Sequence, residues 1–149
     1  MSRVNVGVNP KYLADQHLVA ESVEITMIIG SLKANNFLIK SAIPTDFKLG
    51  KGHMNFFKKK ITYLYNRLKE VNKEMINRGF NPGTNIQLQD IPEEFKNDWQ
   101  PSQVDSNIIR NRICEKIVKK KNKFCRYYKE NLDNNKLTKL IKNGELYFV

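Results

Sequence analysis

The chain has 149 residues, which is enough for one domain with a single sizeable hydrophobic core. Hydrophobic residues make up 40% of it, but its apolar runs fall far short of the roughly 20 residues that span a bilayer, which excludes a membrane-spanning helix. The 26 lysines and arginines exceed the 15 acidic residues and give a net charge of +11, so we expect a polyanionic partner, a nucleic acid rather than a membrane surface, unless the source simply has a lysine-rich proteome.

The first expected helix begins at Asn9-Pro10, because asparagine is a good N-cap and proline is well tolerated at the first helical position. It is predicted to end at Gly30, since glycine commonly follows the last helical turn. A second short helix is expected around residues 32–39. The proline and glycines of residues 43–53 predict a loop after it.

The clearest helix covers residues 57–75, where apolar residues recur at spacings of three and four and form one buried stripe. It is expected to end at Gly79, and residues 81–100 are expected to be mostly loop. Pro101 then opens another helix, which a short aromatic segment and a tail follow. Because only the first eight residues resemble a strand, the sequence predicts an all-α fold, a compact single domain of about three main helices with long loops.

The first helix carries titratable side chains along one face. His17, Ala20 and Glu24 follow Leu13 at offsets of four, seven and eleven residues, so they form one stripe beside the core-facing side. The ordinary interpretation is a partly buried histidine satisfied by a carboxylate or a backbone group, and the alternative is a reactive pocket. No metal site is expected, because the two histidines and two cysteines lack the spacing of metal ligands.

The second residue, Ser2, is small, and Met1 is commonly removed before such a residue. Removal would leave the α-amine of Ser2 at the chain end, with a reference pKa of about 7.7–8.0, so that a useful fraction is uncharged at neutral pH. A lysine, with a pKa near ~10.4, must be perturbed to reach the same state. The amine, the adjacent Arg3 and a carboxylate on the next helix therefore form a candidate Schiff-base site.

Seven sequence blocks follow one another in the order found in a known family. They are S-R-V-N at 2–5, L-A-D-Q-H-L-V-A-E at 13–21 with Glu24 beyond it, L-G-K-G-H-M-N-F-F at 49–57, R-G-F-N at 78–81, D-I-P-E-E-F at 90–95, R-I-C-E-K-I at 112–117 and F-C-R-Y-Y at 124–128. In these blocks the chain resembles the virus-encoded pyrimidine-dimer DNA glycosylases with abasic-site lyase activity. We therefore expect a glycosylase-like domain over residues 1–129 and a C-terminal extension over residues 130–149.

The resemblance implies a compact all-α fold whose N-terminal segment lies between helices. The α-amine of Ser2 would attack the sugar C1′ and displace the base, and β-elimination from the resulting imine would break the strand. Glu24 would stabilise the developing sugar cation and assist proton transfers. The residues implied to hold the sugar and the phosphates are Arg3, Gln16, His17, Arg112 and Lys116.

The chain departs from the family pattern in two places. The family's helix carries basic residues directly before the catalytic glutamate and three residues after it, where this chain has Val23 and Met27. Fewer bonds to phosphates weaken salt-dependent DNA binding. Phe124 and Cys125 also stand where the family has tryptophan and tyrosine. We therefore expect this chain to share the family's catalytic chemistry more closely than its substrate.

A basic region follows the last expected helix. Clustered positive charge binds phosphates without sequence preference, and aromatic rings stack on unpaired bases. The alternative is a solvated helix end whose aromatic residues pack in the core. The residues predicted to bind nucleic acid here are Lys119, Lys120, Lys121, Arg126, Tyr127 and Tyr128.

Three functions remain open from the sequence. The first is a DNA repair glycosylase and lyase for damaged pyrimidines, and the second is the same chemistry on a modified base or a small or cyclic signalling nucleotide. The third is a basic nucleic-acid-binding protein without catalysis, against which the retention of Ser2 and Glu24 argues. We expect a monomer that binds damaged duplex DNA or a nucleotide, no membrane and no cofactor. The two cysteines suggest no disulfide framework, and the sequence shows no secretory pattern, so a cytoplasmic location is expected. The resemblance to virus-encoded enzymes implies that this would be the cytoplasm of an infected host cell.

Overall fold

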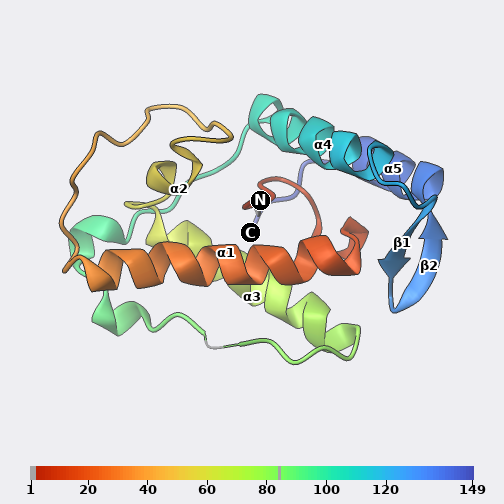
Figure 1. The fold of residues 1–149 in the computed structure, drawn as a ribbon. Helices are drawn as coiled ribbons and strands as arrows, with labels where there is room; N and C mark the ends of the chain where they lie inside the picture. Colours follow the sequence, from red (N-terminus) through yellow and green to blue (C-terminus); the bar gives the residue numbers. More distant parts are fainter. Residues whose placement is uncertain (1–2, 84) are drawn as a thin grey trace.

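The computed structural model describes residues 3–83 and 85–149, and within them five α-helices accompany one antiparallel pair of strands (Figure 1). The helices are α1 (Asp15–Ala34), α2 (His53–Phe56), α3 (Ile61–Asn77), α4 (Gln103–Val118) and α5 (Asn134–Asn143), and the strands are β1 (Phe124–Tyr127) and β2 (Glu130–Asp133). The fold is therefore mostly helical, as predicted, but it is not purely α. Among the described residues, no helix has the length and apolarity needed to cross a membrane.

The N-terminal helix differs from the prediction at both ends. Asn9 caps only a 3-10 turn, and α1 begins later in the chain. The predicted stop at Gly30 is wrong, because the buried side chains of Ile29 and Leu32 continue the core-facing stripe on both sides of the glycine. Their burial outweighs the cost of about 1 kcal/mol that glycine carries inside a helix. The separate helix expected at residues 32–39 is consequently absent, since its first turn belongs to α1.

The tail expected after the aromatic segment is instead a β-hairpin followed by α5. The hairpin turn places Tyr128 and Lys129 at φ of 53° and 63°, a conformation usually marked in sequences by glycine or asparagine. Asp15 stabilises this turn by accepting hydrogen bonds from both backbone N–H groups, at 3.0 and 2.8 Å. Leu137 and Ile141 of α5 are fully buried, so the C-terminal extension contributes to the same core.

Residues 3–8 form no strand and instead run through the interior between the helices (Figure 1). Val4, Val6 and Val8 are fully buried. The alternation that resembled a strand therefore reflects burial of these valines, whereas the backbone between them is held by side chains from several helices. The backbone N–H of Val4, for example, donates to Nε2 of His53 in α2 at 3.0 Å.

Three buried arginines hold the backbone carbonyl oxygens of residues 7–13. Buried carbonyl groups need hydrogen-bond donors, and no sheet supplies them along this segment. The guanidinium groups take over that role across N–O distances of 2.6–3.2 Å. The contacts run from Arg110 to Gly7, from Arg67 to Val8, and from Arg78 to Pro10, Lys11 and Leu13.

The ion pair between Glu21 and Arg67 is the most deeply buried of these contacts, because neither side chain is exposed at all. Arg67 donates from Nε to Glu21 Oε2 at 2.6 Å and from Nη2 to Oε1 at 3.0 Å. We expect Glu21→Gln to lower the free energy of unfolding by about 3–5 kcal/mol, since the buried guanidinium would lose its counter-charge. Urea unfolding followed by circular dichroism measures this change.

The matched control is Glu93→Gln, which breaks an ion pair with Lys96 whose glutamate side chain is 90% exposed. An exposed pair of this kind contributes little, so the control is expected to unfold at nearly the wild-type urea concentration. Equal losses in the two variants would contradict a special role for the buried pair.

Candidate active site

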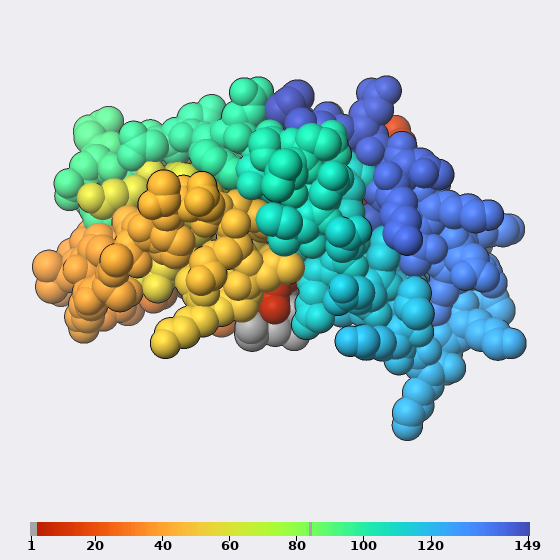
Figure 2. Space-filling model, turned by 90° about the horizontal axis from the view of Figure 1, so that it is seen from above, coloured from red at the N-terminus to blue at the C-terminus, as the bar shows by residue number. Residues whose placement is uncertain are grey.

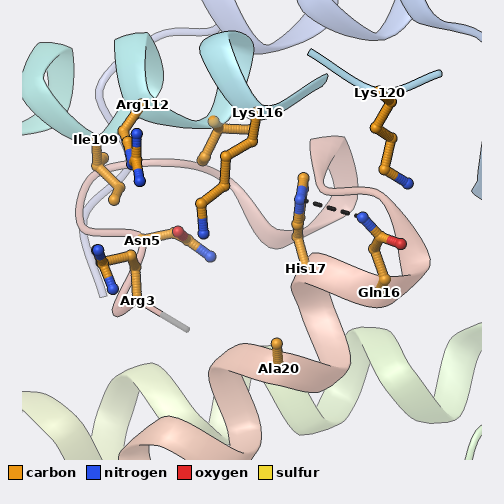
Figure 3. Close-up of a pocket in the computed structure, with 10 residues that line it drawn as sticks. Arg3, Asn5, Gln16, His17, Ala20, Ile109, Arg112, Lys116 and Lys120 are labelled. Carbon is orange, nitrogen blue, oxygen red and sulfur yellow. Dashed lines mark hydrogen bonds between the residues drawn. The ribbon is translucent and has the colours of Figure 1, made fainter. Parts of the chain in front are cut away.

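A cleft of about 410 Å³ lies between the N-terminal half of α1, the C-terminal half of α4 and the start of the described chain (Figure 3). This volume lies within the range of small-ligand sites. The cleft brings together all five residues that the sequence predicted to hold the substrate. It also contains Lys120, which was predicted to bind nucleic acid, and Asn5, which the sequence analysis missed. Its polar lining residues are Arg3, Asn5, Gln16, His17, Arg112, Lys116 and Lys120.

The cleft concentrates positive charge, and no carboxylate lines it within the described part of the chain. Burial lowers the pKa of Arg3, and the nearby charge of Arg112 lowers it further. Burial likewise lowers the pKa of Lys116, with Arg3 and Arg112 adding to the effect. These groups therefore repel one another, and an anion in the cleft would relieve the repulsion.

His17 supplies an uncharged group at the same place. Burial lowers its pKa to about 4, and the charges of Lys116 and Lys120 contribute to this shift, so the imidazole is neutral at pH 7. Gln16 Nε2 lies 3.5 Å from His17 Nε2 (Figure 3). If that amide donates, the ring proton sits on Nδ1. The buried Nδ1 has no hydrogen-bond partner within residues 3–83 and 85–149.

Glu24 lies one helical turn beyond Ala20, which lines the cleft, and only 6% of the residue is exposed. Burial raises the pKa of its carboxyl group, and the charge of Arg3 opposes the shift. A carboxyl group with a raised pKa exchanges protons more readily near neutral pH. The charge of Arg3 thus acts on both the cleft and the catalytic candidate, Glu24.

In Figure 2 the red start of the described chain reaches the surface between the yellow segment before α3 and the teal α4.

The other catalytic candidate, Ser2, lies outside the described residues, so the role predicted for its amine stays a prediction. Its neighbour Arg3 is buried, as is Val4. The segment that continues from the chain end is therefore fixed inside the protein, immediately beside the cleft.

Of the six residues predicted to bind nucleic acid after α4, only Lys120 lines the cleft. Two of the others, the aromatic residues, have a structural role that the sequence did not reveal. The guanidinium of Arg78 lies 4.9 Å from the ring centroid of Tyr127 and 4.3 Å from that of Tyr128. Their hydroxyl groups donate to the Lys11 carbonyl oxygen and to Glu74. The remaining three, Lys119, Lys121 and Arg126, are exposed beyond the cleft.

The surface of α1 beside Glu24 is apolar. Val23 is 48% exposed and Met27 is 53% exposed. From Ile25 to Leu32 the helix carries no charged residue, although 28% of the chain is charged. This part of the helix cannot form ion pairs with phosphates, which distinguishes it from the basic cleft on the other side of Glu24.

Residues 1–88 match a family model described as pyrimidine dimer DNA glycosylase. The match covers more than half of the chain, and the chain therefore belongs to this family. The matched range contains both catalytic candidates and the cleft residues of α1, whereas the cleft residues of α4 lie beyond it. Membership indicates a DNA glycosylase, with DNA as its substrate.

Proposed function

We propose that the protein is a DNA repair N-glycosylase with abasic-site lyase activity, which releases damaged pyrimidines by means of the Ser2 α-amine and the Glu24 carboxylate. The observation that carries the proposal is Glu24, buried with a raised pKa, in electrostatic contact with Arg3 at the border of a basic cleft. Membership of the pyrimidine dimer DNA glycosylase family supports the glycosylase part of this proposal.

The reaction begins when the uncharged amine attacks C1′ of the sugar and the base leaves with the electrons of the C1′–N bond. Loss of the amine proton and opening of the C1′–O4′ bond then give the imine. Removal of a C2′ proton breaks the C3′–O bond and cuts the strand, and water finally hydrolyses the imine and restores the amine. Glu24 stabilises the cationic sugar during base release and transfers protons in the later steps.

The cleft would hold the DNA backbone beside the reacting sugar. The charges of Arg3, Arg112 and Lys116 suit phosphate oxygens, which accept hydrogen bonds from cationic donors. Gln16 and the neutral His17 add polar groups to the cleft without adding charge, so they suit the sugar rather than the phosphates. The five side chains together would fix the register of the strand, while they carry no information about base sequence.

A second candidate keeps the amine-and-carboxylate chemistry but changes the substrate to a modified base or a small or cyclic nucleotide. The exposed Val23 and Met27 beside Glu24 favour it, because an apolar surface there forms no ion pairs with a duplex backbone. The volume of the cleft, about 410 Å³, is compatible with a nucleotide.

Borohydride trapping separates these candidates, because it reduces the imine to a stable covalent adduct. The wild-type protein is incubated with abasic, dimer-containing and undamaged duplexes, and hydrolysis of a cyclic dinucleotide is followed in parallel. Adducts with abasic and dimer-containing DNA alone would support the repair function. Turnover of the dinucleotide without DNA adducts would support the second candidate, and binding without either reaction would leave a non-catalytic DNA-binding protein.

Binding to duplex DNA is expected to weaken steeply with salt. A triple variant replaces three lysines with glutamine: Lys119, Lys120 and Lys121. It removes up to about three ion pairs with phosphates. The slope of log affinity against log salt concentration should therefore flatten by up to about 0.9 for each ion pair lost. Fluorescence anisotropy over a range of salt concentrations measures the slope. The matched control replaces the exposed lysines of α5, which removes the same charge away from the cleft: Lys136, Lys139 and Lys142. Equal slopes in both triple variants would show that only net charge matters.

A further inference from the structure

His53 is a buried histidine whose two ring nitrogens both contact backbone groups. Nε2 accepts a hydrogen bond from the N–H of Val4 at 3.0 Å, and Nδ1 contacts the carbonyl oxygen of Lys48 at 2.9 Å. Only 2% of the residue is exposed. The ring therefore ties the N-terminal segment to the loop that precedes α2.

The loop before α2 is shaped to present this ring. Gly50 and Gly52 adopt φ of 70° and 99°, which glycine reaches without the steric cost that a side chain would add. The N–H of His53 donates to the carbonyl oxygen of Gly50 at 3.1 Å. Phe47 and Phe57 then pack edge-on against the imidazole, with centroids 5.5 and 5.4 Å away. The G-K-G-H block thus has a geometric consequence, since it fixes the position of one imidazole.

The two contacts also select one protonation state. Nε2 must be unprotonated to accept from Val4, so the neutral ring carries its proton on Nδ1 and donates to Lys48. Burial lowers the pKa of His53, and the contact with Lys48 opposes this shift. Two charged groups face the ring: Arg3 lowers the pKa, and Glu21 raises it. A protonated ring would direct an N–H group at the Val4 N–H and break the hydrogen bond.

We infer that His53 is a positioning residue for the N-terminal nucleophile, which it orients by anchoring the backbone of Val4. This inference rests on the proposed role of the Ser2 amine. A chain advances at most about 3.6 Å per residue, so an anchor at Val4 limits the reach of that amine to about 7 Å. Covalent attack requires reacting atoms about 3–3.5 Å apart, whereas phosphate binding in the cleft uses other side chains. Loss of the anchor therefore affects the covalent step rather than DNA affinity.

The test compares His53→Leu with His53→Gln. Leucine removes the acceptor for Val4, whereas the glutamine amide can accept that hydrogen bond and does not titrate. Single-turnover borohydride trapping on an abasic duplex is expected to slow by up to about 100-fold in the leucine variant, with the dissociation constant for the duplex nearly unchanged. The glutamine variant is expected to keep most of the wild-type rate at pH 7.

A pH series adds a measurement that packing alone does not affect. Protonation of the amine and of Glu24 affects the wild-type protein and the glutamine variant alike, so the ratio of their trapping rates isolates the titration of His53. Because burial lowers the pKa of His53, that ratio, wild type over variant, is expected to fall only below the ordinary histidine range, at pH values under about 6.5, and the series extends to the lowest pH at which both proteins stay folded. Phe47→Leu, which removes a ring beside His53 and none of its hydrogen bonds, serves as the packing control and should keep the pH profile of the wild type.

Each outcome decides the proposal. Wild-type trapping rates in the leucine variant, or a rate ratio that is constant with pH, would overturn the positioning role and leave the Ser2 mechanism intact. If the leucine variant does not fold, the pH dependence of the ratio of wild-type to glutamine-variant trapping rates decides alone. If the wild-type protein, shown by intact mass to begin at Ser2, forms no adduct on abasic DNA, the nucleophile assignment fails and the positioning role fails with it.

Discussion

A Glu24→Gln variant is expected to lose base release almost completely while it folds and binds DNA as the wild type does. Glutamine keeps the size and most of the hydrogen-bonding capacity of the side chain but removes the charge. A fixed charge beside a forming sugar cation acts in a partly buried site without reorganisation, and removing such a group costs about 10²–10³-fold in rate. Single-turnover release of the base from a dimer-containing duplex measures the loss.

Stability provides a second, independent readout for the same variant. Burial raises the pKa of Glu24, so the folded state binds its proton more tightly than the unfolded chain does. The contribution of this group to stability is therefore present at low pH and lost as the pH rises through the raised pKa. At pH 7 the ionised carboxylate opposes folding, and Glu24→Gln is expected to be at least as stable as the wild type, in contrast to Glu21→Gln.

The control for this prediction is Glu115→Gln on α4, where an exposed carboxylate lies 3.6 Å from Arg112 of the cleft. It removes a negative charge near the site without touching α1, and base release is expected to continue at close to the wild-type rate. If the Glu24 variant also releases the base at that rate, the catalytic assignment is wrong.

The parts of the fold that the sequence predicted are those that depend on local periodicity. The stripe over residues 57–75 predicted α3, although the helix begins only at Ile61, and the helix predicted to open at Pro101 begins two residues later, at Gln103. The hairpin turn at Tyr128 and Lys129 could not be predicted in this way, because a distant carboxylate, Asp15, stabilises a conformation that neither residue favours by itself. Its signal lies in a long-range contact and not in the local sequence.

The buried arginines show a similar limit for charge. Arg67, Arg78 and Arg110 add three to the count of positive residues, yet each is buried and bonded to the N-terminal segment. The count of 26 lysines and arginines therefore overstates the number of cations available to a polyanion. The net charge changes little, because Glu21 and Asp15 pair with two of these arginines in the interior. The meeting of Arg3 and Arg112 was predicted only through the family resemblance, because no spacing along the chain indicates it.

Blocking the chain end is expected to abolish adduct formation, whereas Ser2→Ala is expected to remain active, because the proposed nucleophile is the α-amine and not the side chain. Retained Met1 would displace the amine by about 3.3–3.6 Å, and acetylation would remove its nucleophilic lone pair. The protein cannot compensate by sliding the segment, since Val4 is held by His53, and Asn5 by Glu21. Intact mass to establish the first residue, followed by borohydride trapping on abasic DNA, tests this directly.

A protein that retains Met1 and still forms the trapped adduct at full rate would eliminate the Ser2 amine as nucleophile. The amine of a lysine would then have to react. Lys11 is the lysine closest to the chain end in sequence, but it does not line the cleft. Lys116 does line the cleft, and burial lowers its pKa towards the range in which an amine is nucleophilic.

Peptide mapping of the adduct distinguishes the N-terminal amine from Lys116, since the modified peptide carries either the chain end or residue 116. The expected result is modification at the N-terminal peptide alone, with trapping lost when that amine is acetylated and retained in Ser2→Ala.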